Sequence, residues 1–169
     1  MEIERRTSIE LRASGRKLEG YAATFGNEAR IGSFTEIILP GAFRGSLGGD
    51  IVALVDHDPS RLLARTKSGS LKLAEDSKGL AFEIQVPDTQ TGRDVLALAE
   101  RGDLGGMSFG FTVPKGGERW RGDRRELLAV ELREISVVSS WPAYGGTIVQ
   151  ARARIPARLA AAIRFLETT

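Results

Sequence analysis

The sequence predicts a mainly β domain with a few helices (α+β), built as a barrel or a sandwich. Short segments rich in β-forming residues recur along the chain, and turns that carry glycine or polar residues separate them. A length of 169 residues fits a single domain that buries about two thirds of the surface its unfolded chain exposes. We expect the body of the domain at residues 1–150, followed by a C-terminal helical segment at 151–169.

The strands are expected where apolar residues alternate or cluster between turns. In chain order the expected strands are Ile3–Leu11, Leu18–Phe25, Thr35–Leu39, Ile51–Asp56, Ser70–Ala74, Leu80–Val86, Met107–Val113 and Glu131–Ser139. The polar stretch Glu118–Glu126, which follows two glycines, is expected to form a surface loop or hairpin.

Three segments have helical signals. Pro40–Leu47 starts with proline, although its two glycines oppose a helix. Thr91–Arg101 has Thr91 as a candidate N-cap and Gly102 as a candidate stop. Ile155–Leu166 places apolar residues at helical spacing, which predicts an amphipathic helix that packs on the domain or docks a partner.

The amino-acid composition excludes or disfavours several classes of site and function. The absence of cysteine excludes disulfides, thiolate zinc sites and a cysteine nucleophile, and it fits a reducing cytoplasm. A formal net charge of +2 does not favour nucleic-acid binding. The charged N-terminus and the lack of any long apolar stretch predict a soluble protein that is neither secreted nor membrane-bound.

The single histidine, His57, stands at the end of the apolar run Ile51–Asp56 and is flanked by two aspartates. A side chain that exchanges a proton near neutral pH, presented at the end of a buried strand, suits a general base. A structural role for a lone histidine is the competing interpretation. With one histidine and no cysteine in the chain, a zinc site is disfavoured.

Ser108 is the candidate nucleophile. In the strand expected at Met107–Val113, Ser108 and Gly110 point to one face while the bulky side chains point to the other. Glycine near a serine lets a substrate or a second backbone approach without a side chain in the way. Serine and glycine in a strand are also compatible with a structural role or a bulge.

A serine–histidine mechanism needs a third group that orients the imidazole, and the candidates are Asp56, Asp58, Asp103 and Glu134. Strand alternation turns Asp56 and Asp58 away from His57. Glu134 lies in a β-forming segment that is expected to be half buried, and a buried carboxylate requires a partner. The alternative interpretation is that Glu134 pairs with an arginine on a solvated face. The same alternation argues against a metal-dependent hydrolase that uses His57 with its two aspartates.

Six short motifs together resemble the prohead (capsid maturation) proteases of tailed phages, which are related to the herpesvirus assemblins. They are GYAATF at Gly20–Phe25, PGAF at Pro40–Phe43, DHD at Asp56–Asp58, TKSGSL at Thr66–Leu71, GMSFGF at Gly106–Phe111 and EISVVS at Glu134–Ser139. The resemblance implies a closed or partly open β-barrel surrounded by helices, with His57 as base, Ser108 as nucleophile and Glu134 as the third member. In assemblins the third member is a second histidine, so Glu134 departs from that branch.

The resemblance also implies a function. It implies a serine endopeptidase that cleaves scaffold and capsid-precursor segments in the assembling prohead, in the cytoplasm of the host bacterium, and that processes itself. Its partners would be the major capsid protein precursor and further copies of the chain, as a homodimer or multimer, with no cofactor or metal. Oxyanion donors would come from backbone amides or a serine hydroxyl in Ser139–Ala143, which has no arginine. A catalytically inactive scaffolding module that docks capsid precursor is the alternative.

Overall fold

The computed structural model describes residues 2–8 and 10–139. The boundary expected at residue 150 and the amphipathic helix expected at Ile155–Leu166 lie outside these residues.

Thirteen strands form three sheets in the described part of the chain. The five-stranded sheet has the order β1 (Glu4–Ser8), β10 (Gly106–Thr112), β13 (Glu131–Val138), β6 (Val52–Val55) and β7 (Asp58–Arg65). One four-stranded sheet has the order β2 (Glu10–Ser14), β3 (Lys17–Thr24), β9 (Gly79–Gln85) and β8 (Leu71–Glu75). The other has the order β11 (Glu118–Arg121), β12 (Arg124–Leu127), β5 (Phe34–Ile38) and β4 (Glu28–Ile31).

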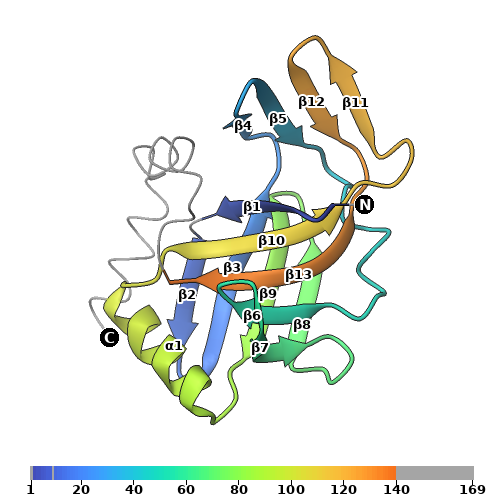
Figure 1. The fold of residues 1–169 in the computed structure, drawn as a ribbon. Helices are drawn as coiled ribbons and strands as arrows, with labels where there is room; N and C mark the ends of the chain where they lie inside the picture. Colours follow the sequence, from blue (N-terminus) through green and yellow to red (C-terminus); the bar gives the residue numbers. More distant parts are fainter. Residues whose placement is uncertain (1, 9, 140–169) are drawn as a thin grey trace.

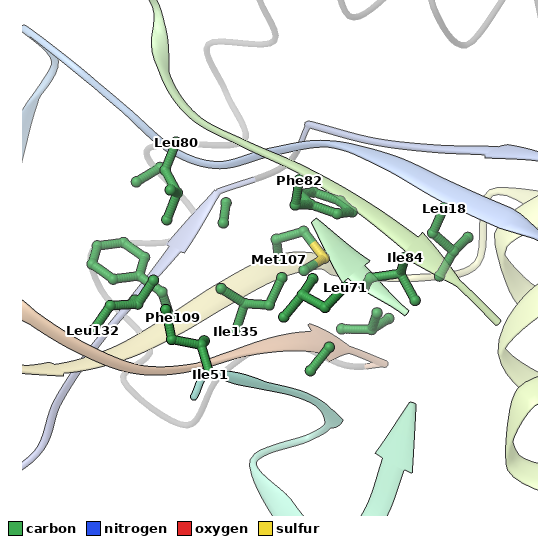
Figure 2. Packing of buried hydrophobic residues seen from close by; sticks show 14 of the residues in the cluster. Leu18, Ile51, Leu71, Leu80, Phe82, Ile84, Met107, Phe109, Leu132 and Ile135 are labelled. Carbon is green, nitrogen blue, oxygen red and sulfur yellow. The ribbon is translucent and has the colours of Figure 1, made fainter. Parts of the chain in front are cut away.

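The main core lies between the five-stranded sheet and the sheet of β2, β3, β8 and β9. Figure 2 shows Met107, Phe109 and Ile135 of the first sheet packed toward Phe82 and Ile84 of the second, and all five side chains are buried. The sheet of β4, β5, β11 and β12 extends beyond one end of this core (Figure 1). One face of the five-stranded sheet is therefore committed to the core, and its opposite face is available for polar side chains.

The mainly β (α+β) class is confirmed, with a single α-helix among the described residues, but the expected closed or partly open barrel surrounded by several helices is not. Within the described residues the hydrogen-bonded pairing leaves three open sheets, and β1 and β7 are the edges of the largest. The segment expected as one strand, Ile3–Leu11, divides into β1 and β2, which join different sheets. Because the two halves pair with different partners, the N-terminal strands link the sheets that face each other across the core.

The helix α1 (Gln90–Arg101) is the α-helix that the described residues contain. Its N-cap is Thr89, two residues before the expected Thr91, and the Thr89 side chain accepts a hydrogen bond from the Gly92 amide. Gly102 ends the helix in the left-handed conformation, as expected, with φ of 74°.

The helix expected at Pro40–Leu47 is wrong, because this segment forms a series of turns. The backbone hydrogen bonds of this segment join residues three positions apart. The Arg44 amide donates to Gly41 O at 3.3 Å, and the Ser46 amide donates to Phe43 O at 3.0 Å. Gly41 has φ of 97°, which a helix does not allow. The Glu75 carboxylate accepts the Gly41 and Phe43 amides at 2.7 and 3.0 Å, so a distant side chain satisfies donors that a helix leaves open.

The polar stretch after Gly117 forms the hairpin of β11 and β12, which confirms the hairpin alternative. The strands β4 and β7 were not expected. Among the described residues, no helix has the length and apolar character needed to cross a membrane.

Candidate active site

His57 lies in the two-residue turn of the hairpin formed by β6 and β7. Val55 pairs with Asp58, and the residues between them, Asp56 and His57, have φ of 52° and 60°. Positive φ at both positions matches the tight hairpin turn that suits the natural twist of two strands. The turn projects the imidazole beyond the end of β6, next to the neighbouring strand β13.

Asp56 fixes this turn to the end of β13. Its backbone amide donates to Val137 O at 2.8 Å. Its carboxylate accepts the Ser139 amide at 2.8 Å and the Ser139 hydroxyl at 2.5 Å, and an Arg61 guanidinium nitrogen lies 3.0 Å away. Left-handed backbone is costly for residues other than glycine, so such contacts are needed to hold the conformation.

The structure brings His57 and Glu134 together. The distance between His57 Nδ1 and Glu134 Oε1 is 2.6 Å, and 8% of Glu134 is exposed. Because a carboxylate only accepts hydrogen bonds, this contact places the ring proton on Nδ1 and leaves Nε2 as the basic nitrogen. The Arg5 guanidinium also lies near this oxygen, with Nε at 3.9 Å and a side chain that is half exposed.

Ser136 joins the pair, and sequence reasoning missed it. The Ser136 hydroxyl donates to Glu134 Oε2 at 2.6 Å and accepts the His57 backbone amide at 3.2 Å. A signal was present, because Ser136 lies two residues after Glu134 and therefore on the same face of β13.

Ser108 lies on the same face of the sheet as this cluster. It is opposite Ser136 in the pairing of β10 with β13, and Gly110 is opposite Glu134. Directly opposed residues in an antiparallel pair have Cβ atoms about 5 Å apart. Phe109 and Met107 turn into the core, which confirms the alternation expected for this strand.

Gly110 provides space for the Glu134 side chain. A Cβ atom at this position would lie 2.5 Å from Glu134 Oε1, which is a severe overlap. The glycine after the serine was expected to leave room for a substrate or a backbone. In the structure the space is occupied by the carboxylate that contacts His57.

The Ser108 hydroxyl does not hydrogen-bond His57 in the described structure, and 1% of Ser108 is exposed. Catalytic hydrogen bonds in substrate-free enzymes are often long and tighten only in the complex.

The other candidate carboxylates have different partners. Asp58 accepts the Ser60 hydroxyl and amide at 2.7 and 2.9 Å, and the hydroxyl bond is the main cause of the lowered pKa of Asp58. Asp103 lies 3.0 Å from Arg101. Asp56 and Asp58 thus have partners other than the His57 ring, which agrees with the expectation that they do not orient it. The argument from strand alternation was wrong, however, because Asp56 and His57 form a turn and not a strand.

Residues 2–8 and 10–139 contain no group of three or more histidine or acidic side chains arranged to hold a metal ion. In the stretch expected to supply oxyanion donors, the Ser139 amide and hydroxyl both bond Asp56. The rest of that stretch, 140–143, lies outside the described residues.

A histidine held by a carboxylate, on the same sheet face as a serine, is the constellation of the triad serine hydrolases. The sequence model of the caudovirus prohead serine protease family matches residues 2–160, and the chain belongs to this family. It is 37% identical over 114 residues to the prohead protease of Enterobacteria phage HK97, an alignment that covers 64% of this chain and 48% of that protein. The chain thus spans about half the length of this relative. No solved structure matches it.

Proposed function

We propose that the protein is a serine endopeptidase that cleaves scaffold and capsid-precursor segments during maturation of a phage or prophage-derived capsid, and that also cleaves itself. The observation that carries the proposal is the 2.6 Å contact between His57 Nδ1 and Glu134 Oε1, on the sheet face that presents Ser108. Membership of the prohead serine protease family supports it, as does the name of the HK97 relative.

In the proposed reaction, Ser108 Oγ attacks the scissile carbonyl carbon while His57 Nε2 takes the hydroxyl proton. Glu134 keeps the proton on Nδ1 and stabilises the imidazolium that forms. His57 then returns the proton to the leaving amine, and an acyl-enzyme remains on Ser108. Water, deprotonated by His57, hydrolyses this ester and restores the free serine.

The bond between Ser108 and His57 is expected to form when a peptide binds. The turn that carries His57 is fixed through Asp56 to β13, the strand that pairs with the strand of Ser108. A positioned base contributes about 10²-fold to 10⁴-fold to such a reaction.

The substrates we propose are the major capsid protein precursor and its scaffold segments, cut inside the assembling prohead in the host cytoplasm. The acting form would be a homodimer or a multimer packed within the prohead. The segment 151–169 would serve as a docking or processed segment. Family membership is the support for these proposals.

Co-expression with the cognate capsid precursor tests the function. The mass of the precursor, measured after purification, is expected to fall to that of the processed form with the wild-type chain and with Ser68→Ala, a control in an exposed turn. Ser108→Ala should leave the precursor at full length. A precursor that copurifies uncut with the wild-type chain would instead favour the inactive scaffolding module, and cleavage by Ser108→Ala would contradict the proposal.

A further inference from the structure

We infer that Ser136 is a positioning residue of the proposed active site, where its hydroxyl ties the backbone of the His57 turn to the Glu134 carboxylate. This inference rests on the proposed function, because it assigns a task within the same site.

The three residues form a closed ring of hydrogen bonds. The His57 amide donates to Ser136 Oγ at 3.2 Å, Ser136 Oγ donates to Glu134 Oε2 at 2.6 Å, and Glu134 Oε1 lies 2.6 Å from His57 Nδ1. His57 thus enters the ring twice, once through its backbone and once through its side chain.

The direction of each bond in the ring is fixed by chemistry. A backbone amide can only donate, so the Ser136 hydroxyl accepts from His57 and uses its single proton for Glu134. With one oxygen held by Ser136, the carboxylate presents its other oxygen to Nδ1. The ring therefore fixes both the orientation of the carboxylate and the tautomer in which His57 Nε2 is basic.

The position of Ser136 makes its hydroxyl hard to replace. Ser136 is fully buried and stands between Leu54 of β6 and Ser108 of β10 in the sheet. Alanine at this position would remove the partner of the His57 amide and of Glu134 Oε2 together. Since His57 has φ of 60°, loss of the amide bond also loosens a turn whose conformation depends on its contacts.

Thr112 offers a matched control on the same two strands. Its hydroxyl is buried and donates to the Glu131 carboxylate at 3.1 Å, so Thr112→Val removes a hydroxyl-to-carboxylate bond between β10 and β13. This bond lies at the opposite end of the strand pair from Ser108. If Ser136 served stability alone, Ser136→Ala and Thr112→Val would act alike.

The rate of serine modification by a fluorophosphonate tests the inference with the purified full chain. In this reaction Ser108 Oγ bonds to phosphorus, fluoride leaves, and His57 takes the proton. We expect Ser136→Ala to slow labelling by about tenfold to hundredfold, since about 1 Å of misplacement has effects of this size. Ser136→Thr, which keeps the hydroxyl, should label within about threefold of wild type, as should Thr112→Val.

A proton magnetic resonance spectrum gives a readout independent of labelling. His57 is the single imidazole of the chain, so the strongly deshielded signal of a proton held between Nδ1 and Glu134 can be assigned without ambiguity. We expect this signal in wild type, Ser136→Thr and Thr112→Val. In Ser136→Ala it should move upfield or broaden through exchange with water.

Separate outcomes overturn the inference and the proposed function. Wild-type labelling rate and an unchanged proton signal in Ser136→Ala would overturn the role of Ser136 and leave the function intact. If Ser136→Ala fails to fold, Ser136→Cys, which keeps the shape of the side chain with a somewhat larger atom that donates only weakly, replaces it, and a wild-type rate in that variant would overturn the inference. Wild-type protein without a label on Ser108 would contradict the proposed function itself.

Discussion

Two polar clusters, one on the five-stranded sheet and one between that sheet and the sheet of β4, β5, β11 and β12, differ in how their carboxylates are neutralised. The catalytic cluster, named for its proposed role, consists of His57, Glu134 and Ser136, and its carboxylate faces a titratable imidazole. The charge network consists of Glu4, Arg6, Glu36, Glu118 and Arg125, and its carboxylates face guanidinium groups that are always charged. The first arrangement can move a proton, whereas the second can only hold strands together.

The charge network connects β1 to the sheet of β5 and β12. Arg125 is 7% exposed, and its guanidinium lies 2.8 Å from Glu4 Oε1 and 3.0 Å from Glu36 Oε2. Arg6 holds both oxygens of Glu36 at 2.6 and 2.8 Å. The hydrogen bonds of Arg125 lower the pKa of Glu4, and Glu4 in turn raises the pKa of Arg125. These contacts fix the strand β1 beside the strand that carries Ser108.

Replacement of the carboxylate in the catalytic cluster has the largest expected effect. In Glu134→Gln the amide oxygen can still accept from Ser136, which turns the amide nitrogen toward His57 Nδ1 and favours the tautomer protonated on Nε2. Fluorophosphonate labelling should fall by about 10³-fold to 10⁴-fold with little change in melting temperature. Labelling within threefold of wild type would contradict the proposal that the Glu134 carboxylate takes part in the reaction, and the two clusters would then not differ in function.

Removal of the central arginine of the charge network should lower stability. Arg125→Met leaves the buried Glu36 with less compensation, and the free energy of unfolding should fall by about 3 kcal/mol. Arg121→Met is the control, because Arg121 is largely exposed and its contact with Glu126 is 3.8 Å long, so the change should stay within about 0.5 kcal/mol. Urea unfolding measures both. Equal losses in the two variants would contradict a structural role for the network.

A side chain at Gly110 should damage the catalytic cluster without touching the charge network. Gly110→Ala displaces the Glu134 carboxylate, and labelling should slow by about 10²-fold. Gly48→Ala, where an added Cβ meets open space, should label like wild type. If Gly110→Ala retained full labelling, the position of Glu134 would not matter for the reaction.

The smallest expected effect is on the pH dependence of stability. The pKa of Glu4 is lowered from about 4.5, chiefly by its hydrogen bond to Arg125, so its contribution is present above pH 4.5 and is lost as the pH falls through the folded-state value. Acid unfolding of Glu4→Gln should therefore have a shallower loss of stability below pH 4.5 than wild type. A slope identical to wild type would mean that Glu4 does not contribute.

Sequence patterns predicted the parts of the fold that depend on near neighbours. Alternation along β10 placed Ser108 and Phe109 on opposite faces, and both faces are as expected. The choice of Glu134 as partner for His57 agrees with the contact found. The first inference depends on the period of a strand. The second joins residues 77 positions apart, and it came from the scarcity of histidine, the position of Glu134 in a β-forming segment and the family resemblance.

Features that depend on pairing between distant strands could not be predicted. Glu4 and Arg125 are far apart in the chain, and only the placement of β1 and β12 brings them together. In the sequence Ser136 cannot be distinguished from any other serine in a strand. Its role becomes visible only when the fold places the turn of His57 beside it. Strand spacing predicted a barrel or a sandwich and the resemblance implied a closed or partly open barrel, while the observed pairing leaves β1 and β7 as open edges.

The site of the fluorophosphonate adduct tests the central claim most directly. Peptide mapping of the labelled wild-type chain by tandem mass spectrometry should locate the adduct on Ser108 and on no other serine. His57→Gln should lose this adduct, because the chain contains no second imidazole to act as base. An adduct on another serine, or one that forms at the wild-type rate in His57→Gln, would contradict the assignment of Ser108 and His57 as nucleophile and base.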